Sequence, residues 1–447
     1  MRDFDFVVLG GGSGGLAAAQ RAAAHGARVA LLEPGALGGT CVHAGCVPKK
    51  AMWLAAQLAS RGRAAQAIGF AHGVGALDWP TFVAHRQRYI DAIERGYGDK
   101  LASAGITVIP QRGRFVEVSA SGASTVEAGD GVRLQAPHVL VATGAQAQRP
   151  AVTGAELGAV SDDVFGWNAL PERLAIVGGG YIAVEFAGLL RALGAEVTML
   201  VRGARLLDGF DAELADALTA QYRASGIEVC FGTTVDGLAS DRGRLRVGDG
   251  SFDTLLWATG RAPNAGDLGL DDMNLGRDAR GRIIVDSRQN TKIPGIYAVG
   301  DVTTQPALTP VAVAAGRCLA DRLFGARADA ALDLPLVPTV VFAQPPLASI
   351  GLSEAQARAE HGEAVSVRRS RFRPMLTALG GGESRSLFKI VCAGPEQRVV
   401  GLHLFGEGVD EILQGFALAI ARGVSVDDLE QAIAIHPTSA EEVLFAR

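Results

Sequence analysis

The chain has 447 residues, more than a single hydrophobic core usually organises, so about two to four domains are expected. Hydrophobic residues make up 48% and charged residues 20%, as in an ordinary globular protein. The formal net charge of −5 gives no reason to expect nucleic acid or an anionic membrane as a partner. No run of about 20 apolar residues and no secretory leader is visible, so we expect a cytoplasmic protein without membrane contact.

Residues 4–33 predict a complete β-α-β unit. An apolar strand leads into the turn Gly10-x-Gly12-x-x-Gly15, an alanine-rich helix follows, and a second strand ends at Glu33. Glycine suits such a turn because it tolerates positive φ and leaves room for a pyrophosphate. The helix N-terminus then offers unpaired N–H groups and a partial positive charge to that phosphate. The pattern therefore indicates a dinucleotide site.

Two of the five cysteines, Cys41 and Cys46, are separated by only four residues. A helical pattern starts at about Val47, so both thiols are expected near a helix N-terminus, where the dipole lowers a thiol pKa. In a reducing cytosol such a pair indicates redox chemistry or metal binding. No second cysteine pair or His/Cys pair completes a tetrahedral zinc site, so we expect no metal. From spacing alone, two inert structural cysteines are the alternative.

Residues 173–202 predict a second β-α-β unit of the same design. Its turn reads Gly178-x-Gly180-x-x-Ala183, and its second strand ends at Arg202. One such turn is a weak indication. Two turns, each between a strand and a helix and each followed by a charged strand end, strongly indicate two nucleotide sites rather than ordinary tight turns.

The remaining chain shows three further strands that end in small-residue turns, at 139–143, 255–259 and 296–299. The sequence pattern changes at about Pro335. Alternating strands are expected at 387–391 and 399–404, and helices at 410–423 and 426–433. The sequence thus predicts an α/β protein with two Rossmann-like dinucleotide-binding domains and a C-terminal α+β domain.

The cysteine segment GGTCVHAGCVPKK strongly resembles the active-site segment of glutathione reductases, which belong to the FAD-dependent pyridine nucleotide–disulfide oxidoreductases. The resemblance covers essentially the whole chain. It includes GGGYIAVEFAG at 178–188, YAVGD at 297–301, LTPVAVAAGR at 308–317, PTVVF at 338–342 and IHPTSAEE at 435–442. It implies NADPH-dependent reduction of glutathione disulfide, through FAD and a Cys41–Cys46 redox disulfide, for thiol redox balance.

The resemblance also implies a division of the chain and an assembly. The FAD-binding domain comprises 1–144 and, after an NAD(P)H-binding domain at 145–263, continues as the central segment 264–334. The dimerisation domain is 335–447. The enzyme is expected to be a homodimer whose active sites are shared between subunits.

The family pattern assigns roles to individual residues. Cys46 is implied as the thiol nearest the flavin and Cys41 as the outer thiol that attacks the substrate. His436 is implied as the acid/base, oriented by Glu441, and reaches the active site of the other subunit.

Further roles concern the flavin and the bound ligands. The resemblance implies a Lys49–Glu185 ion pair beside the flavin, with Tyr181 covering the flavin until the nicotinamide arrives. The implied FAD contacts are Gly10, Gly12, Ser13, Gly14, Gly15, Glu33, Gly39, Thr40, Lys49, Thr143, Gly144, Gly300, Asp301 and Thr309. The implied NADPH contacts are Gly178, Gly180, Tyr181, Ile182, Glu185, Arg202, Arg205, Gly260 and Arg261. The implied substrate contacts are Ser13, Arg21, Tyr97, Arg317, Met375 and Glu442.

The two strand ends predict different nucleotides. Glu33 can accept hydrogen bonds from ribose hydroxyls, which suits FAD, whereas Arg202 suits a 2′-phosphate. NADPH is therefore expected over NADH. Asp208 stands where the family usually has a second arginine, which predicts weaker selectivity.

Several features leave alternatives open. Gln20, His43 and Leu376 depart from common family residues, so another small disulfide (glutathione amide, a trypanothione-like disulfide or lipoamide) remains a candidate substrate. A non-catalytic flavin- and nucleotide-binding redox sensor is the other reading. At the C-terminus, Ser439-x-x-Glu442 also fits a helix capping box, in which case only one of the two glutamates partners the histidine.

Overall fold

The computed structural model describes residues 2–119, 122–269, 275–334 and 336–447. Met1 lies outside the described residues. So does Pro335, the residue at which the sequence predicts the C-terminal domain to begin. The chain divides into two compact units. The first comprises Met1–Lys49, Thr81–Gln148 and Gly260–Asp333, and the second comprises Lys50–Pro80, Arg149–Thr259 and Leu334–Arg447.

The first unit is built on a parallel sheet with the strand order β19-β8-β2-β3-β4. Its strands are β2 (Phe6–Leu9), β3 (Val29–Leu32), β4 (Thr107–Ile109), β8 (His138–Val141) and β19 (Ile296–Ala298). Strand β2 sends alternate side chains to opposite faces: Phe6 and Val8 join one buried cluster, Val7 and Leu9 another. Burial on both faces explains the continuous apolar run in the sequence.

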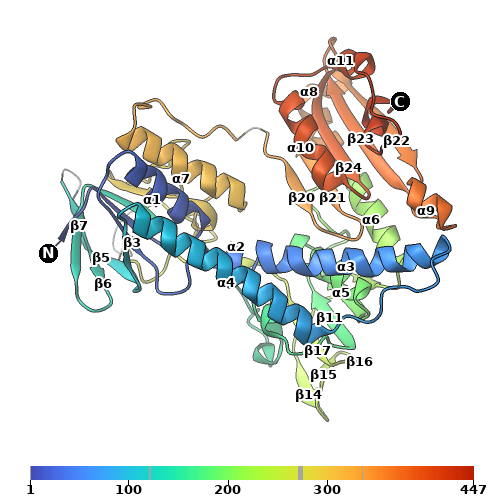
Figure 1. Cartoon of the computed structure of the whole chain (residues 1–447), viewed down its shortest axis with the longest axis horizontal. Coiled ribbons are helices and arrows are strands. Elements are labelled where there is room, and N and C mark those ends of the chain that lie inside the picture. The colour runs from blue at the N-terminus through green and yellow to red at the C-terminus, as the bar shows by residue number, and fades with distance from the viewer. Residues whose placement is uncertain (1, 120–121, 270–274, 335) are drawn as a thin grey trace. The chain divides into compact units, whose positions relative to one another are not determined.

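Helices α1 (Ser13–Ala24) and α7 (Thr309–Phe324) lie side by side on one face of this sheet (Figure 1). Their backbones approach closely because the contact is made of glycine and alanine. A Cβ added at Gly316 of α7 would lie 2.4 Å from the carbonyl oxygen of Gly14 in α1. The alanine-rich sequence of α1 thus serves close helix packing, which holds the N-termini of both helices at one edge of the sheet.

A second sheet, with the order β1-β7-β6-β5, packs against the opposite face. Its strands are β1 (Arg2–Asp3), β5 (Gly113–Glu117), β6 (Ser124–Ala128) and β7 (Arg133–Ala136). Phe115 and Val126 of this sheet share a buried cluster with Val7 and Leu9. The unit also contains most of α4 (Trp79–Ser103) and a short ladder of β9 (Ala145–Ala147) and β18 (Arg261–Pro263).

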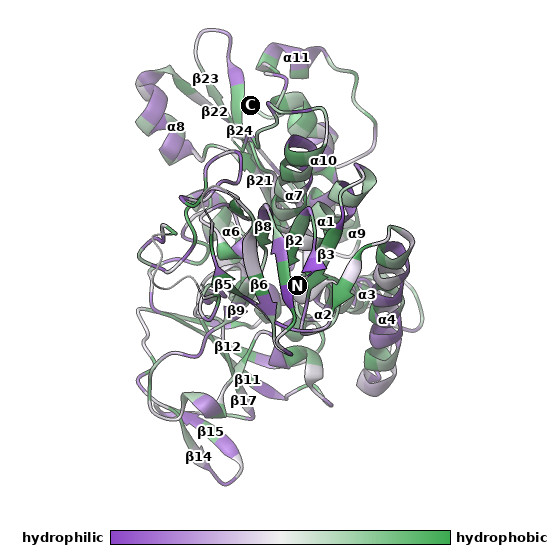
Figure 2. Ribbon diagram, turned by 90° about the vertical axis from the view of Figure 1, so that its left-hand side faces the viewer, coloured by the Kyte–Doolittle hydropathy of each residue, from purple (hydrophilic) through white to green (hydrophobic). Residues whose placement is uncertain are grey.

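The second unit contains another parallel sheet, with the order β10-β17-β11-β12-β13. Its strands are β10 (Ala159–Val160), β11 (Arg173–Val177), β12 (Glu196–Val201), β13 (Glu228–Phe231) and β17 (Thr254–Trp257). Helix α5 (Tyr181–Ala192) connects β11 to β12, and α6 (Ala212–Ala224) connects β12 to β13. The small sheet of β14 (Ala239–Asp241), β15 (Arg244–Val247) and β16 (Gly250–Phe252) ends in a hydrophilic tip (Figure 2).

An antiparallel sheet with the order β20-β21-β24-β23-β22 forms the C-terminal part of this unit. Its strands are β20 (Thr339–Val341), β21 (Leu347–Gly351), β22 (Val365–Phe372), β23 (Ser386–Ala393) and β24 (Arg398–Phe405). Five helices accompany it among the described residues: the hydrophilic α8 (Glu354–His361), α9 (Met375–Leu379), α10 (Val409–Ile420), α11 (Val426–Gln431) and α12 (Glu441–Leu444) (Figure 2). Leu413 and Ala417 of α10 pack against Phe388 and Leu404 of the sheet.

The fold class is confirmed: both β-α-β units form parallel strand pairs, β2–β3 and β11–β12, and an α+β region follows. The strands and helices expected after residue 380 are present within a few residues of their predicted ends. The four-part domain division stays a prediction.

Candidate active site

A cavity of about 530 Å³ opens in the first unit at the carboxyl ends of the parallel strands, where open α/β sheets bind ligands. It brings together most of the predicted FAD contacts and one cysteine. These are Gly10, Gly12, Ser13, Gly14, Glu33, Gly39, Thr40, Thr143, Gly144, Gly300, Asp301, Thr309 and Cys41. Gly15 and Lys49 are predicted FAD contacts that do not belong to this lining.

The first glycine turn joins β2 to α1 and has the shape that the sequence predicts. Gly10 has φ of +112°, and a Cβ there would lie 2.4 Å from the carbonyl oxygen of Ala142. Gly15 serves packing, because its added Cβ would lie 2.0 Å from the carbonyl oxygen of Gly10. At Gly12, by contrast, no described atom lies within 4 Å of an added Cβ.

This turn fits a pyrophosphate. Among the described residues, no side chain caps the N-terminus of α1 and no acid lies in its first turn. The unpaired N–H groups and the positive end of the helix dipole therefore point to open space beside Gly12.

Three carboxylates line the same cavity: Glu33, Asp267 and Asp301. Glu33, just after β3, accepts hydrogen bonds from the N–H groups of Gly11 at 2.7 Å and Gly35 at 2.8 Å, which fixes it beside the turn. Asp301 lies in a short 3-10 turn after β19, and burial raises its pKa, while the positive charge of Arg261 opposes this rise. Arg261, predicted as an NADPH contact, belongs to the first unit, and its charge lowers the pKa of this cavity residue. It also donates to the carbonyl of Ala145 at 2.6 Å.

Asn264 lines the cavity and was not predicted. Its side-chain amide donates to the carbonyl of Thr143 at 3.0 Å, and the Thr143 hydroxyl donates to the carbonyl of Asn264 at 2.6 Å. These bonds join the turn after β8 to the segment that follows β18. No sequence signal links positions so far apart. Gly38, another unpredicted lining residue, has φ of +114°, and its glycine pair with Gly39 could have indicated it.

The cysteine pair lies in two consecutive helices, α2 (Gly39–His43) and α3 (Cys46–Ala67). Cys46 is the first residue of α3, one position before the predicted start, and its sulfur lies 3.5 Å from the hydroxyl oxygen of Thr309 in α7. Cys41 is partly buried in the cavity wall.

The pKa of Cys41 is raised, chiefly because its thiol donates a hydrogen bond to Cys46, and secondly because it is partly buried. Hydrogen bonds from Thr309 and Ser13 act in the opposite direction. The prediction that both thiols have a lowered pKa is therefore wrong for Cys41 in the reduced pair. The contact with Cys46 favours the protonated form of Cys41, so Cys41 needs a base before it can attack a disulfide.

The loop between the cysteines is held locally. His43 donates from Nε2 to the carbonyl of Leu37 at 2.9 Å. A Cβ at Gly45 would lie 2.8 Å from the carbonyl oxygen of Thr40, so this position favours glycine. These contacts give His43 a structural task in the loop that carries both thiols.

The second glycine turn repeats the first. Gly178 has φ of +139°, α5 begins at Tyr181, and the described side chains provide no cap for this helix and no acid in its first turn. Gly180 also faces open space as far as the described atoms extend. Tyr181 is 47% exposed, and Ile182 follows it in the first turn of α5. The turn therefore offers a second site for a pyrophosphate.

The charged residues after β12 lie beside this turn. Arg202 directly follows the strand and is exposed. The N–H of Leu207 donates to the carbonyl of Gly179 at 2.8 Å, which joins the loop containing Arg205 to the glycine turn. Gly260, predicted for the same nucleotide, belongs to the first unit.

Glu185 lies in α5 and is buried. Its carboxylate accepts a hydrogen bond from the N–H of Phe342, just after β20, at 2.8 Å. Lys49 belongs to the first unit, in the first turn of α3, where its N–H donates to the carbonyl of Gly45 at 3.0 Å. The Lys49–Glu185 ion pair stays a prediction.

His436 and Glu441 are in contact, as predicted. Glu441 Oε2 lies 3.0 Å from His436 Nδ1, while the imidazole is 79% exposed and the carboxylate 13%. The pKa of Glu441 is lowered, first by the hydrogen bond from His436 and next by the N–H of Thr438. A carboxylate on Nδ1 orients the ring and assigns the proton there, which leaves Nε2 for acid/base work.

The capping box that the sequence allows at Ser439 and Glu442 is replaced by one at Thr438 and Glu441. In the structure the N–H of Thr438 donates to Glu441 at 3.1 Å, and the N–H of Glu441 donates back to the Thr438 hydroxyl at 3.4 Å. The same glutamate therefore closes the turn and holds His436. Glu442 instead accepts from the Ser370 hydroxyl at 2.6 Å.

The predicted substrate residues lie in different surroundings. Arg21 of α1 pairs with Asp321 of α7, which also lies 2.7 Å from His25 Nε2, so its charge is already balanced. Tyr97 packs against the buried cluster under α1. Arg317 is exposed on α7, and Met375 is 65% exposed on α9.

Within the part of the chain that the structure describes, no helix combines the length and apolarity needed to cross a membrane. Within the same residues, no group of three or more His, Cys, Asp or Glu side chains is arranged to hold a metal ion.

Comparison with known proteins gives consistent results. A family model described as pyridine nucleotide-disulphide oxidoreductase matches residues 4–316, and a model of its dimerisation domain matches residues 337–447. A glutathione reductase of Schizosaccharomyces pombe is 42% identical, covering 99% of this chain and 98% of that protein. Glutathione reductases of Burkholderia cepacia (41%, covering 100% and 98%) and Yarrowia lipolytica (39%, covering 99% and 99%) are similar over the same extent.

Proposed function

Because the chain belongs to the pyridine nucleotide–disulphide oxidoreductase family, we propose that it is an NADPH-dependent glutathione-disulfide reductase. One observation carries the proposal. A cavity suited to a dinucleotide is lined at one place by Cys41, whose thiol is hydrogen-bonded to Cys46. A redox cofactor and a dithiol in contact are the two parts that a disulfide reductase requires.

FAD fits this cavity through the contacts already described. The N-terminus of α1 beside Gly12 receives the pyrophosphate, and Glu33 accepts from the ribose hydroxyls of the adenosine. Asp301 would accept from the ribityl hydroxyls. Bound FAD would supply the two-electron transfer from NADPH to the Cys41–Cys46 disulfide.

The reduced pair then reduces the substrate by thiol–disulfide exchange. Cys41, after losing its proton to a base, attacks one sulfur of glutathione disulfide, which breaks the substrate S–S bond and forms a mixed disulfide. The thiolate of Cys46 next attacks the Cys41 sulfur, which releases the second glutathione and restores the Cys41–Cys46 disulfide. Consumption of the NADPH hydride and one proton balances the two thiols released.

His436 supplies the base and the acid. The raised pKa of Cys41 makes a base necessary, and the first glutathione leaves as a thiolate that is best protonated at once. One imidazole does both when it takes the Cys41 proton and gives it to the leaving sulfur. We assign this task to His436 of the partner subunit, oriented there by the partner's Glu441.

The assembly and location form part of the proposal. The match to a dimerisation domain supports a homodimer, and shared active sites follow from the assignment of His436 in trans. The sparse, odd set of cysteines fits a reducing cytoplasm.

The test is NADPH consumption by the purified protein with glutathione disulfide, lipoamide and trypanothione disulfide in parallel. Glutathione disulfide is expected to give the highest kcat/KM, and Cys41→Ser is expected to abolish it. A higher kcat/KM for another disulfide would overturn the substrate. A protein that binds FAD and NADPH but reduces none of the three would favour the redox-sensor alternative.

A further inference from the structure

The loop after β12 carries opposite charges beside the second glycine turn. Arg202 and Arg205 are followed by Asp208, and α6 adds Asp216. The loop is fixed to the turn, because the N–H of Leu207 binds the carbonyl of Gly179 at 2.8 Å. The carbonyl oxygen of Arg205 also lies 3.6 Å from the position of a Cβ on that glycine. These charges therefore lie beside the part of the proposed site that would bind the adenosine ribose and its 2′-phosphate.

Some of the N–H donors of Arg205 are already in contact with Asp216 and are not free to bind a nucleotide phosphate. Its Nε donates to Asp216 Oδ1 at 2.9 Å, and its Nη2 lies 3.5 Å from Oδ2. This contact occupies the edge of the guanidinium that otherwise binds two oxygens of a phosphate or carboxylate. The pKa of Arg205 is raised, chiefly by the hydrogen bond to Asp216, with a smaller attraction from Asp208.

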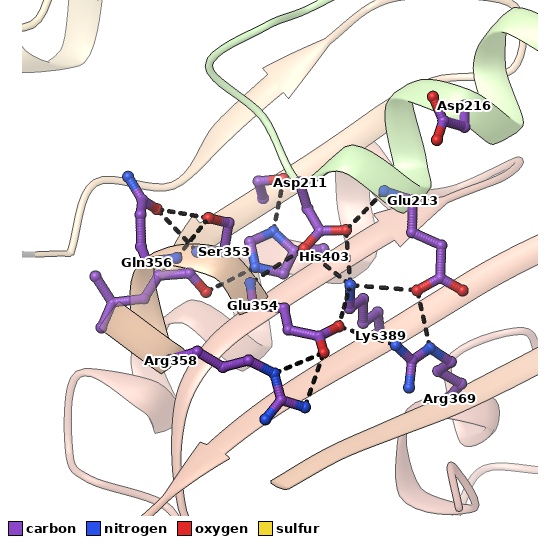
Figure 3. A network of polar contacts seen from close by, with 12 residues as sticks. Asp211, Glu213, Asp216, Ser353, Glu354, Gln356, Arg358, Arg369, Lys389 and His403 are labelled. Atoms are coloured by element: carbon purple, nitrogen blue, oxygen red, sulfur yellow. Dashed lines mark hydrogen bonds and ion pairs between the residues drawn. The ribbon is translucent and has the colours of Figure 1, made fainter. Parts of the chain in front are cut away.

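Helix α6 holds Asp216 in this position. Its N-cap residue Asp211 accepts from the N–H of Glu213 at 3.1 Å and from Lys389 Nζ at 2.9 and 3.0 Å. Lys389 lies on β23, also contacts Glu354, and is 3% exposed (Figure 3). Figure 3 shows Asp216 on the same helix, away from these contacts. Because the helix start is tied to the C-terminal sheet, α6 resists a shift that would separate Asp216 from Arg205.

We propose that Asp216 is a specificity-determining residue that weakens selection for the 2′-phosphate of NADPH. It does so by occupying the binding edge of Arg205 and by placing a negative charge near the incoming phosphate. The proposal rests on the proposed NADPH site. The sequence attributes weak selection of NADPH over NADH to Asp208 alone. The structure adds a second carboxylate, Asp216, which is the one that contacts Arg205 directly.

The effect of removing the carboxylate has a defined size. Both partners are largely exposed, with side chains 42% and 63% accessible. Exposed ion pairs change equilibria by about two- to fivefold. Asp216→Asn, which keeps the size of the side chain, is therefore expected to raise kcat/KM for NADPH about two- to fivefold and to leave NADH nearly unchanged. The gain should shrink as salt rises, because salt screens exposed charges.

The matched control is Glu127→Gln. Glu127 pairs with Arg133 at 3.1 Å on an exposed surface of the first unit, so the variant removes a similar charge from a similar pair. Its NADPH and NADH kinetics should stay at wild-type values. In the double variant Asp216→Asn, Arg205→Ala, the part of the gain that comes from the freed guanidinium should disappear, and only the smaller part that comes from removing a negative charge should remain.

A binding measurement separates this proposal from the proposed enzyme activity. Isothermal titration calorimetry with adenosine 2′,5′-bisphosphate and with AMP is expected to show a larger preference for the bisphosphate in Asp216→Asn than in wild type. An unchanged or smaller preference in the variant would overturn the role of Asp216 alone. A bisphosphate bound no better than AMP by either protein would overturn the NADPH assignment as well.

Discussion

At the scale of single residues, Cys41 and Cys46 differ in surroundings and therefore in task. Cys41 lines the cavity, and its hydrogen bond with Cys46 raises its pKa. Cys46 begins α3, where the helix dipole favours a thiolate. Cys41→Ser is expected to lose disulfide reduction but to keep the long-wavelength absorbance of a thiolate beside oxidised flavin. Cys46→Ser is expected to lose both. Absorbance spectra and NADPH assays of the two variants decide between the roles, and full turnover in Cys41→Ser would contradict them.

Arg202 carries the next prediction. As an exposed cation directly after β12, it is placed to bind a 2′-phosphate by a charge-assisted hydrogen bond. Such a bond contributes about 1.5–3 kcal/mol, so Arg202→Ala is expected to lower kcat/KM for NADPH by about 10- to 150-fold. NADH use should change little. Steady-state kinetics with both nucleotides provide the measurement, and an equal loss with NADH would show that Arg202 does not read the phosphate.

The residues that the sequence reveals are those with a local signature. Gly10 and Gly178 are recognisable because a tight strand–helix turn needs glycine, and the cysteine pair because of its spacing. Asn264 and Asp216 have no such signature, since their partners Thr143 and Arg205 are distant or in another element. Contacts of this kind depend on the folded chain, and sequence alone does not indicate them.

At the scale of elements, the N-terminus of α6 depends on one buried cation. Lys389 contacts Asp211, Glu213 and Glu354 at 2.8–3.2 Å. Lys389→Met would leave the buried carboxylate of Asp211 without its cation, whereas Glu213 and Glu354 would keep arginine partners, so the variant is expected to lower the free energy of unfolding by about 3–5 kcal/mol. Denaturant unfolding at neutral pH measures the loss. The exposed Lys292→Met is the control and should change the stability little.

The same cluster predicts a pH dependence. The pKa of Glu213 is lowered to about 2, despite burial, by Arg369, Arg371 and Lys389, and the pKa of Asp211 is also lowered. Below their unfolded pKa values near 4, the unfolded chain binds more protons than the native one. The cluster therefore contributes its full stability above about pH 4–5 and loses it as pH falls toward 2. The difference in unfolding free energy between wild type and Lys389→Met should shrink over that range, and a constant difference would contradict this account.

The strands were easier to predict from the sequence than the turn that holds His436. The runs in β2 and β11 are apolar on both faces, and the predicted fold class follows from them. The turn before α12 is ambiguous in the sequence because Thr438 and Ser439 are both capping residues with a glutamate three positions later. Glu441 also contacts His436, and Glu442 accepts from the distant Ser370, so the first pair forms; the contact with Ser370 does not appear in the capping pattern.

At the scale of the whole molecule, the surroundings of His436 favour our proposal that it acts in a partner subunit. Ile433 is 98% exposed and Ile435 is 77% exposed, and Phe445 of the same segment is 59% exposed. Large exposed apolar side chains in the same segment as an exposed imidazole are typical of a surface that another chain covers. Together with the match to a dimerisation domain, this supports a catalytic histidine that works in the second subunit.

Subunit mixing tests this arrangement. Neither a Cys41→Ser homodimer nor a His436→Gln homodimer has a complete site, so both are expected to be nearly inactive. In a heterodimer with sites shared in trans, the intact Cys41 of one subunit meets the intact His436 of the other, and one of the two sites is whole. Purified heterodimers, isolated with two different affinity tags, should therefore recover close to half of the wild-type rate. If each subunit used its own histidine, both sites would remain broken, and a verified heterodimer without activity would rule out the shared site.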